Sequence, residues 1–290
     1  MRVLITGATG QVGRALVATR PALVEMRALT RDELDICNEA AVRKAVAEFA
    51  PAVLINAAAY TAVDWAESEP VAAMGANSMG PDYLAEALRP FADARLVHIS
   101  TDYVFDGSGN QPHRPDDPTK PVSVYGRTKL VGEQIVLGTL AERAVVLRTA
   151  WVYAPQGRNF LLTMLRLMKE HGVVNVVSDQ QGSPTAAVSV ARAIWRIVAR
   201  PQVHGVLHWT DGGATSWYKF ALAIAEEAAE VGLLPAGVVV NPIETSSYPT
   251  AAVRPLNSVL DLTESIELLE LQPTPWRDNL RTTLLQLASH

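Results

Sequence analysis

The first thirteen residues constrain the fold of this chain more than any other stretch. An apolar run at residues 3–5 is followed at once by three glycines at equal spacing, Gly7, Gly10 and Gly13. This pattern is typical of a buried parallel strand that leads through a tight turn into a helix. Gly7 permits the turn, Gly10 lets backbone approach a diphosphate, and Gly13 lets the helix pack closely on the strand. Gln11 and Val12 open a helix whose free N–H groups favour phosphate, so this turn predicts a dinucleotide site.

Strands and helices alternate through the first half of the chain, which predicts an α/β fold with a Rossmann-type, doubly wound parallel sheet. We expect strands at residues 3–5, 24–29, 52–56, 95–100, 144–148, 205–210 and 238–243. We expect helices at residues 11–20, 41–49, 124–138, 160–170, 186–200, 216–231 and 276–288, and one that begins at Pro70. The pattern divides the chain into a dinucleotide-binding domain, residues 1–150, and a smaller substrate-binding C-terminal lobe, residues 151–290, with elements that interleave.

Charge, hydropathy and cysteine content argue against several classes of protein. A net charge of −5 does not fit a nucleic-acid-binding protein, which would need a basic face. No apolar run approaches the ~20 residues of a membrane span, and the N-terminus is used as a strand rather than as a signal peptide. The single cysteine, Cys37, excludes a disulfide scaffold. We therefore expect a cytoplasmic protein with neither nucleic acid nor membrane as a partner.

Tyr125 and Lys129 carry the clearest chemistry. They are four residues apart in an expected helix, so they share a face at roughly 5–6 Å between Cβ atoms. A nearby ammonium stabilises a phenolate and brings the pKa of tyrosine, ordinarily near ~10, toward neutral pH. The same lysine can donate to a nicotinamide ribose, so both residues are also predicted to bind the cofactor. Thr101, at the expected carboxyl end of a strand, could hydrogen-bond the carbonyl group that is reduced.

The turn after the second strand fits either nicotinamide cofactor. Arg31 could pair with the 2′-phosphate of NADPH, whereas Asp32 or Glu33 could bind the free 2′-hydroxyl of NADH. A solvated charged turn would have the same composition. We predict that the chain uses NADPH or NADH, with a mild preference for NADPH.

The motifs together resemble those of the extended short-chain dehydrogenase/reductases, and within them the dTDP-4-dehydrorhamnose reductases. The resemblance covers nearly the whole chain, and its C-terminal motifs are more specific than the glycine turn. It rests on the segments GATGQVG at 7–13, LDI at 34–36, NAAAYTAVD at 56–64, STDYVFDG at 100–107, YGRTK at 125–129, RTAWVY at 148–153, DQQGSPT at 179–185 and RPLNS at 254–258.

The resemblance implies reduction of the 4-keto group of dTDP-4-dehydro-β-L-rhamnose to give dTDP-L-rhamnose. In that reaction Tyr125 would donate the proton and Thr101 would bind the carbonyl. Lys129 would adjust the pKa of Tyr125 and hold the ribose. The further cofactor contacts that it implies are Asp35, Ile36, Ala58, Ala59, Tyr60 and Asn77. The implied substrate contacts are Val63, Thr101, Asp102, Trp151 and Arg254. Arg254 resembles a clamp on the diphosphate, which suits a planar, permanently charged donor.

Other functions remain open at this point. The chain could reduce another dTDP-4-keto-6-deoxy sugar, act as an epimerase or dehydratase, or be a non-catalytic NADP-binding regulatory subunit. A dehydratase usually carries an acidic residue after Thr-Asp, whereas Tyr103 follows Asp102 here. Some relatives bridge two subunits through magnesium with acidic side chains where this chain has Ala15 and Ala187. We therefore expect no metal site, and a monomer or a dimer that metal does not bridge.

Overall fold

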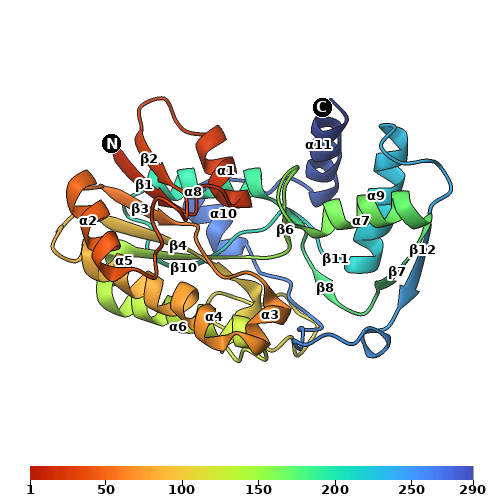
Figure 1. The fold of residues 1–290 in the computed structure, drawn as a ribbon, viewed down its shortest axis with the longest axis horizontal. Coiled ribbons are helices and arrows are strands. Elements are labelled where there is room, and N and C mark those ends of the chain that lie inside the picture. The colour runs from red at the N-terminus through yellow and green to blue at the C-terminus, as the bar shows by residue number, and fades with distance from the viewer. Residues whose placement is uncertain (290) are drawn as a thin grey trace.

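The structure is a computed structural model that describes residues 1–289. The protein is built on one six-stranded parallel sheet (Figure 1). Its strands are β1 (Arg2–Thr6), β2 (Glu25–Leu29), β3 (Val53–Asn56), β4 (Arg95–Thr101), β5 (Ala144–Thr149) and β10 (Gly205–His208). Their order in the sheet is β10-β5-β4-β3-β1-β2. The order reverses between β1 and β3, and α/β sheets bind ligands at the carboxyl ends of strands at such a point. The parallel sheet confirms the predicted Rossmann-type fold.

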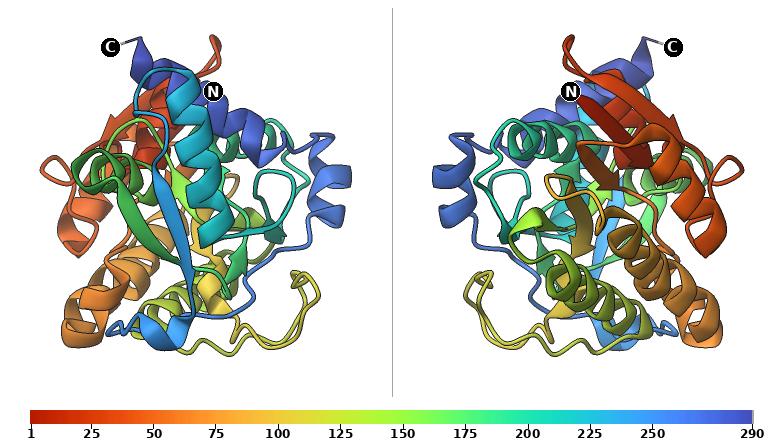
Figure 2. Two further views of the ribbon diagram at one scale, coloured as in Figure 1. Left: turned by 90° about the vertical axis from the view of Figure 1, so that its right-hand side faces the viewer. Right: turned by 90° about the vertical axis from the view of Figure 1, so that its left-hand side faces the viewer.

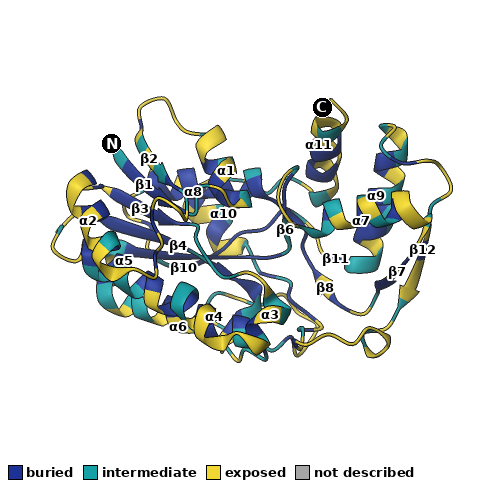
Figure 3. Cartoon of the chain, viewed as in Figure 1, coloured by how far each residue is buried: buried dark blue, intermediate teal, exposed yellow. Residues whose placement is uncertain are grey.

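Helices cover both faces of this sheet, which is why the inner strands β1, β3 and β5 carry nearly continuous apolar runs, whereas the edge strand β2 does not. One face carries α1 (Gln11–Ala18), α8 (Ala187–Val198) and α10 (Thr263–Leu269). The other carries α2 (Glu39–Phe49), α5 (Gly80–Leu88) and α6 (Val124–Leu140). The right-hand view of Figure 2 shows α5 and α6 together on one side of the sheet. Figure 3 shows buried strands between helices that expose only their outer faces.

The smaller lobe has a hydrophobic core of its own, drawn at the right of Figure 1. Its helices are α7 (Phe160–His171), α9 (Trp217–Glu230) and α11 (Trp276–Ala288). Its paired strands are β7 (Val173–Val177) with β12 (Val239–Ile243), β8 (Gln181–Gly182) with β11 (Thr215–Ser216), and β6 (Val152–Tyr153) with β9 (Thr185–Ala186). Between α7 and α9 the chain returns to the large sheet with α8 and β10. A division of domains at residue 150 stays a prediction.

Local sequence signals set several helix ends. The side chain of Asn38 accepts from the N–H of Ala41 and caps α2, as its position predicts. Pro70 occupies the first turn of α4 (Pro70–Met74), which continues through a π-helical segment, Gly75–Met79, into α5. The sequence did not predict α3 (Val63–Ser68) or α10, because such short helices contain too few turns to show a period. The prediction that α1 extends to residue 20 is wrong, since the helix ends at Ala18.

The proline-rich segment at residues 104–122 is tied to the C-terminal part of the chain rather than left as a free loop. The backbone N–H of His113 donates to the carbonyl of Val259 at 2.8 Å, and the N–H of Asp261 donates to that of His113 at 2.7 Å. The ring of His113 stacks on Phe105. This segment therefore joins the large sheet to residues 257–261, which lie near the smaller lobe. Within residues 1–289, no helix has the length and apolar character to cross a bilayer.

Candidate active site

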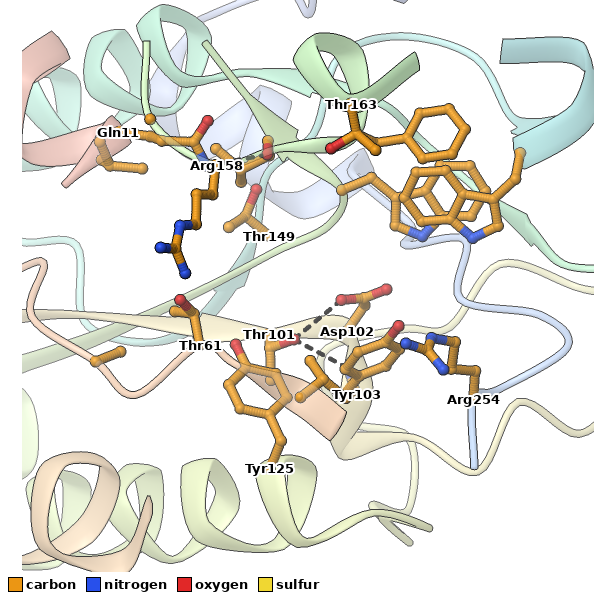
Figure 4. Close-up of a pocket in the computed structure, with 18 of the residues that line it drawn as sticks. Gln11, Thr61, Thr101, Asp102, Tyr103, Tyr125, Thr149, Arg158, Thr163 and Arg254 are labelled. Atoms are coloured by element: carbon orange, nitrogen blue, oxygen red, sulfur yellow. Dashed lines mark hydrogen bonds between the residues drawn. The ribbon is translucent and has the colours of Figure 1, made fainter. Parts of the chain in front are cut away.

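A cleft of about 840 Å³ opens at the carboxyl ends of the strands and is lined by residues of both lobes (Figure 4). The glycine turn lines one part, and β4 and α6 contribute Thr101 and Tyr125. The smaller lobe contributes Trp217, and residues 248–254 complete the wall. The predicted site residues that line this cleft are Gly10, Gln11, Val12, Ala58, Ala59, Val63, Thr101, Asp102, Tyr125, Lys129, Trp151 and Arg254.

The glycine turn is packed so tightly that side chains could not replace its first and third glycines. Gly7 has φ +71°, and a Cβ there would lie 2.6 Å from the backbone nitrogen of Ala58. A Cβ on Gly13 would overlap the carbonyl oxygen of Gly7. Gly10, between them, is the N-cap residue of α1 and has no side chain to cap the helix. The first N–H groups of the helix therefore remain available at the cleft. This backbone cradle suits a diphosphate.

Gln11 is held at the cleft from two directions. Its Nε2 donates to the carbonyl of Val152 at 3.3 Å, and its Oε1 accepts from Nδ2 of Asn159 at 2.8 Å. Asn159 also caps α7 by accepting from the N–H of Leu162. The first turn of α1 is therefore connected directly to the loop before α7. The sequence predicted Gln11 as a cofactor contact but did not predict this connection between the lobes.

The hydroxyl groups of Tyr125 and Thr101 lie together at the centre of the cleft (Figure 4). Ser123 caps α6 by accepting from the N–H of Gly126, which fixes Tyr125 in the first turn of the helix. Burial raises the pKa of Tyr125 to about 12, and a hydrogen bond with Thr101 opposes that rise. The Tyr125 phenol is therefore protonated at neutral pH. The pair can offer a proton and a second hydroxyl to one oxygen atom.

Asp102 adds an acceptor beside this pair. Its Oδ1 accepts from the Thr101 hydroxyl at 3.0 Å, while its Oδ2 has no hydrogen-bond partner among residues 1–289. Burial raises the pKa of this carboxyl to about 6, and the nearby hydroxyls of Ser258 and Thr101 oppose that rise. A buried, unpaired oxygen at a cleft costs stability and marks a position where a ligand hydroxyl would be favourable.

Lys129 is buried beside the cleft, with 2% of its surface exposed. Its Nζ donates to the carbonyl of Ile99 at 2.6 Å and lies 3.4 Å from Nε2 of His98. Burial lowers the pKa of Lys129 to about 8, and the Glu133 carboxylate opposes this. Within the part of the chain that the structure describes, no hydrogen bond joins Nζ to the hydroxyl of Tyr125. The predicted lowering of the Tyr125 pKa by Lys129 is wrong for this structure, because burial dominates and raises it.

Trp151 lies between β5 and β6, two residues after β5 ends, in a conformation that non-glycine residues seldom adopt, with φ +47°. Its indole stacks on that of Trp217, with 3.5 Å between ring centroids and 7° between planes. A Cβ on Gly182 would overlap the indole of Trp151, so the ring rests on bare backbone. Strained backbone persists only where its surroundings enforce it, and it gathers at functional sites. This geometry favours the predicted substrate contact.

Arg254 reaches the cleft already paired. Its Nη2 donates to Oδ2 of Asp64 at 2.7 Å, and Asp64 also accepts from the N–H of Ala252 at 3.1 Å. Figure 4 shows the guanidinium beside Tyr103. The pairing lowers the pKa of the Asp64 carboxyl, although burial opposes this shift. The carboxylate orients the arginine and neutralises part of its charge.

The three predicted cofactor residues that follow β2 lie outside the cleft. Arg31 is exposed on the turn after β2. Oδ1 of Asp35 accepts from the N–H of Cys37 at 3.0 Å, and Ile36 is buried against Gly80. All three follow β2, beside the strand that carries the glycine turn. Their predicted contacts with an adenosine stay predictions.

Asn77 and Tyr60 do not line the cleft either. The amide of Asn77 accepts from the N–H of Tyr60 at 2.8 Å and donates to its carbonyl at 3.0 Å and to the Thr128 hydroxyl at 3.1 Å. The Tyr60 hydroxyl donates to Glu69 at 2.6 Å. Asn77 therefore holds the segment after β3 against α6. A hydrated side chain, the usual expectation for an isolated asparagine in a helix, is wrong here, because Asn77 is fully buried.

Thr149 and Arg158 are among the cleft residues that the sequence did not indicate. The hydroxyl of Thr149 is buried without a hydrogen-bond partner among residues 1–289. It ends β5 opposite Thr101, so the strand-end rule could have found it. Arg158 extends into the cleft near Thr149 in Figure 4, and no sequence signal marks it because it lies in an irregular loop. Within residues 1–289, no three His, Cys, Asp or Glu side chains gather as a metal site.

Comparison with known proteins agrees with this geometry. The family model described as the RmlD substrate binding domain matches residues 1–289. A dTDP-4-dehydrorhamnose reductase of Aggregatibacter actinomycetemcomitans is 42% identical over 287 residues, 97% of each chain. A "Probable dTDP-4,6-dihydroxy-2-methyloxan-3-one 4-ketoreductase" of Streptomyces antibioticus is 44% identical, over 97% of this chain and 94% of the relative.

A solved structure has the same fold. It is the dTDP-4-dehydrorhamnose reductase of Bacillus anthracis str. Ames in complex with NADP, with a TM-score of 0.91 and 34% identity, and the match covers 98% of this chain and 99% of that one. The family model spans nearly the whole chain, and these two relatives exceed 40% identity over 97% and 94% of their own lengths. This chain therefore belongs to the family of the dTDP-4-dehydrorhamnose reductases.

Proposed function

We propose that this protein reduces the 4-keto group of dTDP-4-dehydro-β-L-rhamnose to give dTDP-L-rhamnose, with NADPH or NADH as the reductant. The observation that carries the proposal is the convergence of Tyr125, Thr101 and Asp102 in one cleft with the glycine cradle of α1. A proton donor and a nucleotide cradle in the same cleft fit a ketone reduction that needs a hydride and a proton.

The residues present suit a dinucleotide. Gly7 and Gly13 make a turn that any Cβ would disrupt, and the methyl side chains of Ala58 and Ala59 leave room along the cleft floor. The relative from Bacillus anthracis binds NADP through the same fold. NADPH or NADH, when bound, supplies the hydride. Lys129 would hold the ribose, since its Nζ lies at the cleft and carries donors beyond the one given to Ile99.

The side chains of the large sheet account for the proton. Tyr125 keeps its proton at neutral pH because burial raises its pKa, and it can release that proton when negative charge develops on the carbonyl oxygen. Thr101 donates a hydrogen bond to the same oxygen, which positions it and stabilises the developing charge. Asp102 then accepts from a neighbouring sugar hydroxyl through its unpaired Oδ2.

The opposite part of the cleft suits the nucleotide sugar. The indole of Trp151, stacked on Trp217, offers a flat apolar surface to a deoxy sugar. Arg254 can bind the diphosphate while it remains hydrogen-bonded to Asp64, because a guanidinium has five N–H donors. Val63, next to Asp64 in the sequence, also lines the cleft. The reaction would take place in the cytoplasm, where an exposed free cysteine such as Cys37 stays reduced.

A second candidate substrate is another dTDP-4-keto-6-deoxy sugar. The Streptomyces antibioticus relative, named as a ketoreductase of a different dTDP sugar, is as similar to this chain as the rhamnose enzymes are. Tyr125, Thr101 and Trp151 would serve either substrate, since all would contact the region around C4.

The test is NADPH oxidation with a panel of dTDP-4-keto-6-deoxy sugars, followed by NMR identification of each product. The highest kcat/KM with the rhamnose precursor, and dTDP-L-rhamnose as the product, would support the proposal. A higher value with another keto sugar would favour the second candidate. NADPH binding without turnover of any of them would instead indicate a regulatory subunit.

A further inference from the structure

Lys129 is the last member of a chain of buried polar side chains that crosses the sheet. This series of side chains begins at Thr6 on β1, continues through Asn56 on β3 and His98 on β4, and ends at Lys129 on α6. The hydroxyl of Thr6 donates to Oδ1 of Asn56 at 2.7 Å, and Nδ2 of Asn56 lies 3.0 Å from Nδ1 of His98. Nε2 of His98 lies 3.4 Å from Nζ of Lys129. Thr6, Asn56 and His98 are fully buried.

The direction of these hydrogen bonds is fixed by a backbone group. The N–H of Ala58 can only donate, and it points at Oδ1 of Asn56 at 3.2 Å. This contact identifies that atom as the amide oxygen, so the NH₂ group of Asn56 faces His98. An NH₂ group can only donate, and therefore Nδ1 of His98 accepts.

His98 must then carry its proton on the nitrogen that faces Lys129. Burial, with the Lys129 charge as a second cause, holds the pKa of His98 well below its usual range, so the ring is neutral and carries one N–H. Since Nδ1 accepts from Asn56, that N–H is on Nε2. A neutral amine at Nζ can accept this hydrogen bond, whereas an ammonium meets it donor to donor.

We propose that Asn56 and His98 are positioning residues that hold an N–H against Nζ, so that Lys129 exchanges its proton near neutral pH instead of remaining a permanent cation. The other groups that face Lys129 are the carbonyl of Ile99, which accepts from either form, and Glu133, which favours the cation. Glu133 is itself paired with Arg148 at 2.8 Å, which limits its effect on Lys129. Tyr125 lies one turn away on the same helix.

A role of Asn56 and His98 in catalysis rests on the proposed ketone reduction, which their contact with Lys129 would assist. When the O–H bond of Tyr125 breaks, its proton goes to the product oxygen and a phenolate remains. Nζ of Lys129, which contacts Ile99 and His98 rather than Tyr125 in this structure, would have to turn toward the phenolate. The N–H bond of its ammonium then breaks, giving its proton to the phenolate and leaving an amine that solvent reprotonates. A side chain that carries a proton in this way works best when its pKa lies near the working pH. Donation from His98 to the amine favours a pKa in that range.

The proposal can be tested by NMR without substrate or cofactor. The ¹⁵N spectrum of the histidine rings distinguishes the two neutral tautomers, and the ¹³Cε signal of Lys129, assigned by its loss in Lys129→Met, follows its titration. Asn56→Asp keeps the shape of the side chain but accepts from Nδ1–H, so it reverses the tautomer. His98→Gln lets an amide oxygen face Nζ. His208→Gln is the matched control, because His208 is also fully buried but contacts Arg148 instead of Lys129.

We expect the Nε2–H tautomer in the unmodified protein. We also expect the Lys129 titration to rise by about one pH unit or more in Asn56→Asp and His98→Gln, and to stay unchanged in the control. The Nδ1–H tautomer in the unmodified protein would overturn the proposal even if a variant failed to fold. An unmoved Lys129 titration in both folded variants would also overturn it. If the proposed function is correct, the alkaline limb of kcat against pH moves upward with the titration; absence of turnover would refute the function and leave the tautomer result standing.

Discussion

Replacing Arg254 by alanine tests whether the C-terminal part of the chain holds the nucleotide diphosphate. The guanidinium lies at the cleft with about a fifth of its surface exposed (22%), and Asp64 orients it through a 2.7 Å ion pair. The substitution removes the donor and leaves Asp64 with only the N–H of Ala252 as a partner. It also leaves an uncompensated negative charge where a diphosphate is expected to bind.

The size of the effect follows from these contacts. A hydrogen bond to a charged group contributes about 1.5–3 kcal/mol, which corresponds to roughly a 10- to 150-fold change in affinity. Repulsion from the freed Asp64 adds to the loss, so we expect KM for the dTDP sugar to rise toward the upper end of this range. Arg254→Lys should give an intermediate loss, because one ammonium cannot reproduce the paired geometry of a guanidinium.

The assay is steady-state kinetics with the dTDP sugar varied, together with the Kd of NADPH from fluorescence titration. Arg277→Ala is the matched control, because Arg277 is also ion-paired, to Glu226 at 2.6 Å, but does not line the cleft. We expect the NADPH Kd to be unchanged in both variants. If Arg254→Ala weakens NADPH instead of the sugar nucleotide, the arginine has been assigned to the wrong ligand.

Three further outcomes are expected. Gly182→Ala should displace the indole of Trp151 and raise KM for the sugar with little change in NADPH binding, which kinetics will show; an unaltered KM would argue against an indole contact with substrate. Asp102→Asn should raise the melting temperature at pH 8. The carboxyl of Asp102 has a pKa of about 6 in the folded protein, above the ordinary 3.8. Its ionisation therefore destabilises the folded state fully above pH 6 and not at all below about pH 4. The increase in melting temperature should accordingly be smaller at pH 4.5 than at pH 8. Activity and sedimentation should be the same in EDTA as in millimolar magnesium, because Ala15 and Ala187 offer no carboxylate; a change of mass on chelation would contradict this.

Local spacing was enough to predict the parts of the site that lie within one element or at one strand end. Gly7 and Gly13 could be assigned their roles because backbone sterics at a strand–helix turn leave few alternatives. Thr101 and Asp102 lie at the carboxyl end of a strand that is recognisable from its sequence, and Tyr125 lies in the first turn of an expected helix, four residues before Lys129. Each of these signals is complete within a few residues of sequence.

The remaining features depend on contacts between distant residues. The pairing of Arg254 with Asp64 joins positions 190 residues apart, and no local pattern encodes it. Trp151, in the segment after β5, combines a strained φ with stacking on Trp217, which begins α9 much later in the chain. Strand pairs of two residues, such as β6 with β9, are too short to show an alternation of polar and apolar residues. The rise in the Tyr125 pKa likewise reflects burial in the assembled fold.

The most direct test of Tyr125 as the proton donor is the rate of ketone reduction by Tyr125→Phe, measured with NADPH and the keto sugar at saturating concentrations. The substitution removes one hydroxyl and leaves the ring packed against Tyr103. We expect a fall in kcat of about 10²–10⁴, the usual contribution of a general acid, with an unchanged melting temperature and an unchanged Kd for NADPH. A folded Tyr125→Phe protein that turns over at close to the original rate would contradict this role of Tyr125.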